Sequence, residues 1–341
     1  MATRWILRKG GKGKGFRYET EEGRAVRDRA TLDRIARLRV PPAWTDVHIA
    51  ASRTAAVQAW GMDARGRMQY RYHDRAVEKG QLRKFYRVRL LARELPAIRR
   101  RLRRDMHGRE LGRDTVCAAV VRLIGEGFFR VGSERYLKEN KTFGLSTLRK
   151  SHVDVDGDCT TFAYRGKGGI WQRQTVVDAE LATFVSRMLG TPGPRLFRYA
   201  DESGRWHDLD RTDVSRYLHD RLELPYSPKD FRTWGGTLRC ATVLAELGPA
   251  RTPTEAKRNV NTALRLVAAE LGNTPTICRK SYVHPIVLAR YLDDGVTIAP
   301  ARRTRRSRSV AEHEPEERAL IAFLDEYFPE RRRKPRERVA S

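Results

Sequence analysis

The sequence predicts an α+β protein with a small β-rich N-terminal domain and a larger, mostly α-helical second domain. Three observations support this class. Short alternating segments separated by turn residues fill the chain before residue 75. Apolar residues at helical spacing begin at residue 82. Three strand-like segments with Gly-rich turns occupy residues 153–177 and indicate a three-stranded antiparallel sheet inside the second domain.

The length of 341 residues also fits two domains. We expect the N-terminal domain to span residues 1–75, a polar linker residues 76–81 and the second domain residues 82–296. A basic, charged extension covers residues 297–341, with apolar residues for one short helix within it.

The first clear element is a hairpin, because residues 57–60 and 67–72 flank a turn-like segment at residues 63–66. Strand alternation places the side chains of the second strand on two faces. Both faces carry polar or amphipathic groups, which suits insertion into a nucleic-acid groove; tyrosines half-buried in a small sheet are an equal alternative. One face holds Arg67 and Gln69, and the other holds Met68, Tyr70 and Tyr72.

The second domain begins with two helices, predicted from apolar residues at helical spacing around residues 82–95 and 116–124. The three-stranded meander follows, and Lys167 lies at the tip of its second hairpin between glycines. A lysine at such a place is usually only solvated. The same geometry lets an ammonium group reach across a groove on a flexible arm.

The remainder of the domain is helical, with clear start signals. Ser227 followed by Pro228 predicts a helix that carries Arg232 within its first turns. Gly272 and Asn273 mark a later break between helices.

After that break, Thr274 caps a new helix with Pro275 at its first position, and Tyr282 falls about two turns into it. Arg279 and Lys280 precede this tyrosine, and neighbouring cations stabilise a phenolate, the nucleophilic form of tyrosine. A tyrosine at such a position, taken alone, more often simply packs a helix against a core.

The charge of the chain points to a polyanionic partner. The formal net charge is +27 and the isoelectric point is near 10.6, far beyond what solubility requires. Nucleic acid is favoured over an anionic membrane, because no long basic amphipathic helix with a clean apolar face stands out.

Several other classes of protein are disfavoured. The four cysteines are widely spaced, with no zinc-binding pattern, and predict reduced thiols in a cytoplasmic protein. No signal peptide or membrane-spanning stretch is expected. The Gly-Lys repeat at residues 10–15 fails the phosphate-loop pattern because Phe16 follows it, so no ATP site is predicted. No carboxylate cluster suits a divalent metal either.

Five candidate catalytic residues occur in a characteristic order along the chain. The chain carries an arginine within residues 130–136, a lysine on a Gly-rich hairpin, an arginine within residues 229–237, and a tyrosine nine residues after an asparagine. In this order and spacing the sequence resembles the type IB DNA topoisomerases, in particular their compact bacterial and poxvirus form. The resemblance runs from the N-terminal hairpin to about residue 294. The residues that carry it are Arg130, Lys167, Arg232, Asn273 and Tyr282.

The resemblance implies the catalytic fold shared with tyrosine recombinases, and relaxation of supercoiled duplex DNA through a 3′-phosphotyrosyl intermediate. It makes Tyr282 the nucleophile, Arg130 and Arg232 the phosphate-binding pair, and Lys167 the general acid. Two guanidinium groups suit the charge that develops on the nonbridging oxygens, and a lysine can protonate the leaving 5′-oxygen. The reaction implied needs neither ATP nor metal, so no cofactor is expected.

One position departs from the family. Asn273 stands where most members have a histidine that donates to a nonbridging oxygen, and an amide can donate the same hydrogen bond without titrating near neutral pH. The resemblance further implies a monomer that clamps double-stranded DNA in the nucleoid. Its expected contacts with bases or backbone are Arg67, Gln69, Tyr70, Tyr72 and, from the catalytic domain, Tyr136.

Two alternatives stay open at this point. A tyrosine recombinase uses the same phosphotyrosine chemistry, but it usually has a histidine where Lys229 stands and an all-helical N-terminal half. A non-enzymatic DNA-binding protein would use the same basic surface and would form no covalent adduct.

Overall fold

The structure is a computed structural model of the chain, and it divides into two compact units, Met1–Lys84 and Phe85–Ser341. We describe each unit by itself. The predicted α+β class is confirmed, with the strands of the first unit in one sheet and helices dominating the second. The residues that the structure describes are 4–11, 15–108, 110–301 and 312–328.

The first unit is a five-stranded antiparallel sheet in the order β2-β1-β3-β4-β5, with one helix against it. Asp28 caps that helix by accepting a hydrogen bond from the Thr31 amide (2.8 Å), and Ile35 of the helix packs into the small core. The elements are β1 (Trp5–Gly11), β2 (Gly15–Thr20), α1 (Arg29–Arg37), β3 (Thr45–Ala50), β4 (Val57–Met62) and β5 (Met68–Tyr72).

The predicted hairpin is confirmed as β4 and β5. The Asp63 amide donates to the Arg67 carbonyl (2.9 Å), and Gly66 adopts a φ of +65° that closes the turn. The two expected faces also separate. The Asp63 carboxylate accepts hydrogen bonds from Arg67 and Gln69, whereas Tyr70 and Tyr72 stack on each other with ring centroids 5.8 Å apart.

The segment expected as a linker, residues 76–81, lies in the first two turns of a long helix, α2 (Asp74–Met106). The amides of Ala76 and Val77 both donate to the His73 carbonyl, so helical hydrogen bonding begins before the segment. Charged residues such as those around Gly80 are good helix formers, and polarity there reflects solvent exposure of the helix.

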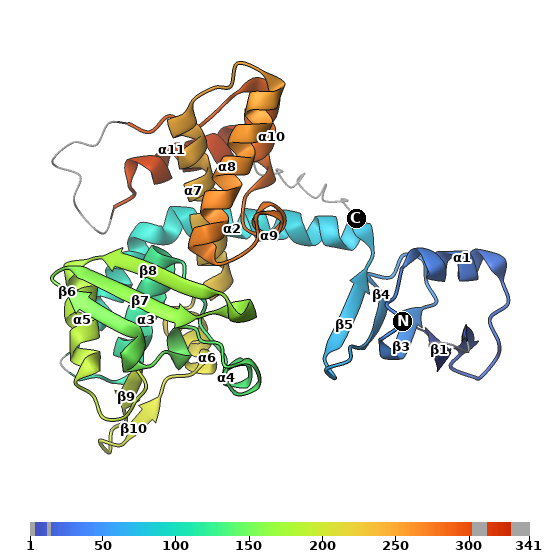
Figure 1. Cartoon of the computed structure of the whole chain (residues 1–341), viewed down its shortest axis with the longest axis horizontal. Helices are drawn as coiled ribbons and strands as arrows, with labels where there is room; N and C mark the ends of the chain where they lie inside the picture. Colours follow the sequence, from blue (N-terminus) through green and yellow to red (C-terminus); the bar gives the residue numbers. More distant parts are fainter. Residues whose placement is uncertain (1–3, 12–14, 109, 302–311, 329–341) are drawn as a thin grey trace, which may run out of the picture. The chain divides into compact units, whose positions relative to one another are not determined.

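The second unit encloses one large core with a three-stranded antiparallel sheet, ordered β6-β7-β8, which confirms the predicted meander. Helices α3 and α5 pack against this sheet (Figure 1). The helices are α3 (Arg113–Gly127), α4 (Glu134–Asn140), α5 (Ala179–Leu189), α6 (Arg211–Arg216), α7 (Pro228–Leu247), α8 (Pro253–Leu271), α9 (Pro275–Ser281), α10 (Pro285–Asp294) and α11 (Pro315–Tyr327). The strands are β6 (Val153–Asp156), β7 (Cys159–Arg165), β8 (Trp171–Val177), β9 (Arg198–Ala200) and β10 (Trp206–Asp208).

The short helix expected in the C-terminal extension is confirmed as α11. It is not a solvated part of a tail, because Leu320, Phe323 and Leu324 are buried in the main core. The ion pair between Arg99 of α2 and Glu317 of α11 (2.8 Å) adds a polar anchor. The rest of the predicted basic tail, residues 302–311 and 329–341, lies outside the described residues.

All four cysteines are free thiols, and three of them are buried. Across the described ranges of the chain, no helix combines the length and the apolar character needed to span a membrane.

Candidate active site

Helix α7 positions Arg232 one turn after a well-formed helix start. The carboxylate of Asp230 accepts hydrogen bonds from the backbone amide and the hydroxyl of Ser227 (both 2.8 Å), and Arg87 of α2 binds its other oxygen (2.7 Å). The Arg232 side chain then points inward and is only 4% exposed. Its Nη2 donates to the carbonyl oxygen of Leu271 at 2.9 Å.

Arg130 lies in a loop that follows α3. Phe128 leaves that helix in the left-handed conformation (φ +54°), and the Leu145 amide donates to the Arg130 carbonyl (2.9 Å), which fixes the backbone. The guanidinium Nη2 donates to the carbonyl oxygen of Gly272 (2.8 Å) and to Oδ1 of Asn273 (2.7 Å).

The two arginines therefore meet at the C-terminus of α8, where Arg232 binds the carbonyl of Leu271 and Arg130 binds the next one. Carbonyls in the last turn of a helix lack partners within the helix and carry partial negative charge, so they attract cations. Gly272 ends the helix with a φ of +58°. A Cβ atom at Gly272 would lie 2.1 Å from Oε1 of Gln172, so glycine also admits β8 close to this turn.

Tyr282 lies about two turns after Pro275, as predicted, and caps the C-terminal end of the short helix α9. Thr274 caps α9 as predicted, accepting a hydrogen bond from the Ile277 amide (3.3 Å). The helix ends at Ser281, and His284, the residue before Pro285 of α10, has the extended backbone (ψ 124°) that a following proline favours. The Tyr282 ring lies beside two cations of α7, with Arg232 Cζ 5.4 Å and Lys229 Nζ 6.0 Å from its centroid.

The site is cationic because two arginines meet in it, and burial and their mutual repulsion act against that charge. Burial, and then the nearby charge of Arg130, lower the pKa of Arg232 to about 10, while Tyr282 and Tyr164 act in the opposite direction. A buried cation whose pKa is lowered in this way is stabilised when an anion binds. The arrangement therefore favours an anionic ligand with at least two acceptor oxygens.

A competing nucleophile in the same helix is disfavoured. Burial raises the pKa of the Cys278 thiol to about 11, although Arg232 and Arg130 act against the shift. The thiol is therefore protonated at neutral pH, and only a thiolate attacks efficiently. Burial likewise raises the pKa of Tyr164 to about 12.

Asn273 is oriented by Arg130, because its Oδ1 accepts the guanidinium and its Nδ2 must then face the other way. That Nδ2 is buried and has no hydrogen-bond partner among the described residues. Buried amide groups are nearly always paired, so this donor is available to a bound ligand.

Lys167 lies at the tip of the β7–β8 hairpin, where Gly168 has a φ of +78°. Its side chain is exposed, and no hydrogen bond or ion pair joins it to any residue that the structure describes. The base of the hairpin nevertheless lies next to the arginines, since the Gln172 side chain contacts both Gly166 and Gly272. The structure thus gathers Arg130, Arg232, Asn273 and Tyr282, and holds Lys167 on an adjoining hairpin.

The expected DNA contacts lie in both units. In the first unit Tyr70 and Tyr72 are exposed on β5, and Arg67 and Gln69 are turned toward Asp63. In the second unit Tyr136 is 46% exposed on α4.

Two neighbours of the site were not predicted. Lys229 has no predicted role in the site, although it lies three residues before Arg232 and therefore on the same face of α7. Gln172 had no role in the prediction. The structure turns Gln172 inward between exposed Trp171 and Arg173 on β8, and the sequence alone does not indicate this, because tryptophan is usually the more buried residue.

Comparisons with known proteins match both parts of the chain. Residues 75–301 match the family described as eukaryotic DNA topoisomerase I, catalytic core, and residues 15–63 match bacterial DNA topoisomerase IB, N-terminal domain. DNA topoisomerase 1B of Acanthamoeba polyphaga mimivirus is 30% identical over 267 residues, which cover 76% of this chain and 80% of the viral protein. DNA topoisomerase 1B of Vaccinia virus (strain Copenhagen) is 26% identical over 171 residues, covering 49% and 50%. DNA topoisomerase 1 of rabbit fibroma virus (strain Kasza) is 26% identical over 180 residues, covering 51% and 53%.

Proposed function

The chain belongs to the type IB DNA topoisomerase family, and we infer from this that it relaxes supercoiled duplex DNA by cleaving and rejoining one strand. As a member of the family it is a type I isomerase whose substrate is DNA. We propose that its own reaction proceeds through a 3′-phosphotyrosyl intermediate at the site on α7, α8 and α9, without ATP or a required metal.

In the proposed reaction Tyr282 is the nucleophile. Its phenol oxygen forms a bond to phosphorus and its proton passes to water, while the bond from phosphorus to the 5′-oxygen breaks. Lys167 donates a proton to the departing 5′-oxygen, which is otherwise a poor leaving group. The covalent intermediate conserves the phosphodiester energy, so attack by the 5′-hydroxyl rejoins the strand after it has swivelled.

The proposal rests most strongly on the convergence of Arg130 and Arg232 beside the Tyr282 ring. The carbonyl oxygens of Leu271 and Gly272 each accept a hydrogen bond from one guanidinium N–H, as a nonbridging phosphate oxygen would. A scissile phosphate binds the remaining donors of both guanidinium groups. Each such contact, held in place before the reaction, contributes about 3 kcal/mol to stabilising the transition state.

Asn273 completes the phosphate site in place of the family's histidine. Its Nδ2 is buried and has no hydrogen-bond partner among the described residues, so donation to a nonbridging oxygen is favourable because it pairs this buried donor. Because an amide does not titrate, this contact is insensitive to pH around neutrality.

The first unit supplies further contacts to the same duplex. Exposed Tyr70 and Tyr72, with Arg67 and Gln69 on the other face of β5, contact bases or backbone in a groove. Tyr136 adds a contact from the second unit. We propose that one chain acts as a monomer that clamps the duplex, and that it works in the cytoplasm on nucleoid DNA.

The test combines plasmid relaxation with detection of a covalent adduct, both in the presence of EDTA and without nucleotide. Wild-type protein is expected to relax supercoiled plasmid and, after denaturation with detergent, to leave DNA bound to protein. Tyr282→Phe removes the nucleophilic oxygen and is expected to abolish both signals. Tyr199→Phe, a tyrosine elsewhere in the same unit, is the matched control and is expected to keep both.

Two results would contradict the proposal. An adduct that persists in Tyr282→Phe would move the nucleophile to another residue. Wild-type protein that binds DNA with steep salt dependence but forms no adduct would be a DNA-binding protein only. A tyrosine recombinase would form the adduct but would need paired sites, so efficient relaxation of a plasmid without such sites separates it from the proposed enzyme.

A further inference from the structure

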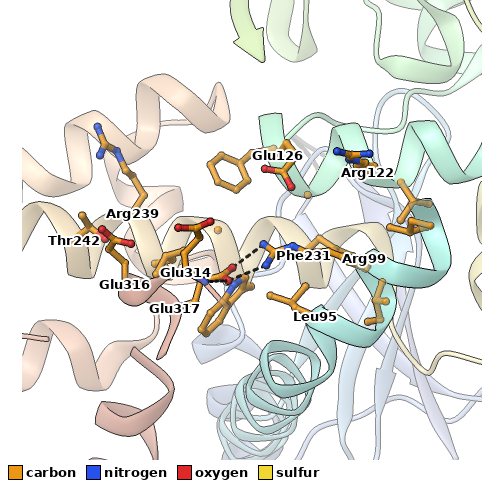
Figure 2. A pocket seen from close by; sticks show the side chains of 18 of the residues that line it. Leu95, Arg99, Arg122, Glu126, Phe231, Arg239, Thr242, Glu314, Glu316 and Glu317 are labelled. Atoms are coloured by element: carbon orange, nitrogen blue, oxygen red, sulfur yellow. Dashed lines mark hydrogen bonds and ion pairs between the residues drawn. The ribbon is translucent and has the colours of Figure 1, made fainter. Parts of the chain in front are cut away.

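The second unit contains a cavity of about 380 Å³ that is separate from the candidate active site. It lies between α2, α3 and α7, with the start of α11 at its rim (Figure 2). None of the five proposed catalytic residues lines it. Its volume is in the range of pockets that bind small organic molecules.

The walls of the cavity are largely apolar and partly aromatic. Such walls favour a ligand with an apolar body, because burial of that body removes it from water. The residues that supply this surface are Leu95, Ile98, Val121, Phe128, Phe231 and Trp234.

The charged lining is acidic, although the whole chain is strongly basic. Five glutamates and three arginines line the cavity, and the arginines are already paired. Arg99 binds Glu317 at the centre of the view in Figure 2. Arg122 pairs with Asp178 and Glu180, and Arg239 pairs with Glu270. These last three carboxylates lie outside the cavity lining, so the charge of two arginines is neutralised elsewhere.

Glu126 is a lining carboxylate that remains solvent-exposed, although protein atoms crowd around it. It makes no hydrogen bond or ion pair with any described residue, and Figure 2 shows it on α3 near the Arg99–Glu317 pair. Crowding by protein atoms raises the pKa of its carboxyl, although Arg99 and Arg122 act against the rise. A cation bound beside Glu126 would supply the partner that its ionised form lacks.

A second lining residue also has an unused polar group. The Trp234 side chain is 4% exposed, and its indole N–H has no hydrogen-bond partner in the described part of the chain. Buried indole N–H groups are normally paired. Two lining groups, the Glu126 carboxylate and the Trp234 indole N–H, therefore have no hydrogen-bond or ion-pair partner among the described residues.

We propose that this cavity binds a small primary amine that carries an aromatic ring and a hydrogen-bond acceptor. The ammonium group pairs with Glu126, the ring packs against Phe128 and Phe231, and the acceptor receives the indole N–H of Trp234. DNA is excluded as the occupant, because phosphates would meet glutamates. The proposal concerns binding by the DNA-free protein and stands independently of the proposed catalytic roles.

Three related probes test the proposal by calorimetry on the full chain without DNA. Tyramine has the ammonium, the ring and a phenolic acceptor; phenethylamine lacks the acceptor; and 2-(4-hydroxyphenyl)ethanol lacks the charge. Tyramine is expected to bind at one saturable site and most tightly of the three. An ion pair with a solvent-exposed carboxylate strengthens binding by up to about five-fold, so the neutral alcohol is expected to bind about two- to five-fold more weakly.

Four variants locate the site. Glu126→Gln is expected to weaken tyramine about two- to five-fold, and Leu238→Trp, which adds bulk to the cavity lining, to abolish binding. Trp234→Phe is expected to weaken tyramine but leave phenethylamine unchanged. Glu202→Gln, a glutamate in the β9–β10 turn, is the matched control and is expected to bind like wild type.

Plasmid relaxation by Glu126→Gln at the wild-type rate establishes that the variant is folded. The proposal is overturned if wild type shows no saturable binding of tyramine at millimolar concentration. It is also overturned if Glu126→Gln and wild type bind tyramine equally, or if the neutral alcohol binds as tightly as the amine.

Discussion

Replacing Gly272 by alanine tests how the turn at the end of α8 is built. The residue has a φ of +58°, and an added Cβ would lie 2.1 Å from Oε1, 2.7 Å from Cδ and 2.8 Å from Nε2 of Gln172. The left-handed conformation costs about 1–2 kcal/mol for a residue with a Cβ. Gln172 is 7% exposed and has little room to move, so its displacement adds about 1–3 kcal/mol.

We therefore expect Gly272→Ala to lower the free energy of unfolding by about 2–5 kcal/mol, a large part of the total for a domain. Urea unfolding at 25 °C measures this for wild type, Gly272→Ala, Gln172→Ala and the double variant. Gln172→Ala removes the clash, so the double variant is expected to recover the steric part and retain only the backbone cost.

Gly157 supplies a matched control for the backbone cost. It has a φ of +55° in the β6–β7 turn, and no atom lies within 4 Å of an added Cβ. Gly157→Ala is therefore expected to cost only about 1–2 kcal/mol. Strictly additive effects of Gly272→Ala and Gln172→Ala, or equal losses at Gly272 and Gly157, would refute the steric reasoning.

Three further outcomes are expected. Asn273→Ala slows DNA cleavage and Asn273→His retains it in a single-turnover assay, and equal rates for wild type and the alanine variant would remove Asn273 from the site. Arg99→Ala leaves the carboxylate of Glu317, which is 3% exposed, without its cationic partner, and is expected to lower the free energy of unfolding in urea by about 3–5 kcal/mol. The double change Arg99→Met with Glu317→Leu is expected to lower it by less, and equal losses would contradict this reasoning. Burial raises the pKa of Glu317, but its hydrogen bonds and ion pair with Arg99 outweigh burial, so the net pKa is lowered. The resulting stabilisation is present above the unfolded-state pKa of about 4.3 and disappears as the pH falls through the lower folded-state pKa. Wild type is therefore expected to lose more stability in acid than the double variant.

Local structure followed from the sequence where the determinants are close together in the chain. The β4–β5 hairpin and the start of α7 at Ser227 depend on turn and capping interactions within a few residues, and both were predicted. The same rules placed Thr274 at the start of α9 but not the end of that helix at Ser281. Pro285 indicates only the extended backbone of His284, three residues beyond that end.

The candidate catalytic residues came from the order of motifs that the chain shares with a family, which the comparisons now show to be its own. Their roles stay predictions. Periodicity and capping do not bring together residues 130, 232 and 282, because the contacts that gather them at the end of α8 join residues far apart in the chain, such as Arg130 and Gly272.

The sequence by itself determined the α+β class, the β4–β5 hairpin, the three-stranded meander, the starts of α7 and α9, the basic character of the chain and the candidates for phosphate chemistry. Only the tertiary structure decided that Arg130 and Arg232 bind adjacent carbonyls at the end of α8, that Gln172 packs on Gly272, and that α11 joins the core. It also decided the acidic cavity around Glu126. The physical reason is that caps and turns act between neighbours in the chain, whereas burial, repulsion between cations and the shape of a cavity depend on which distant segments pack together.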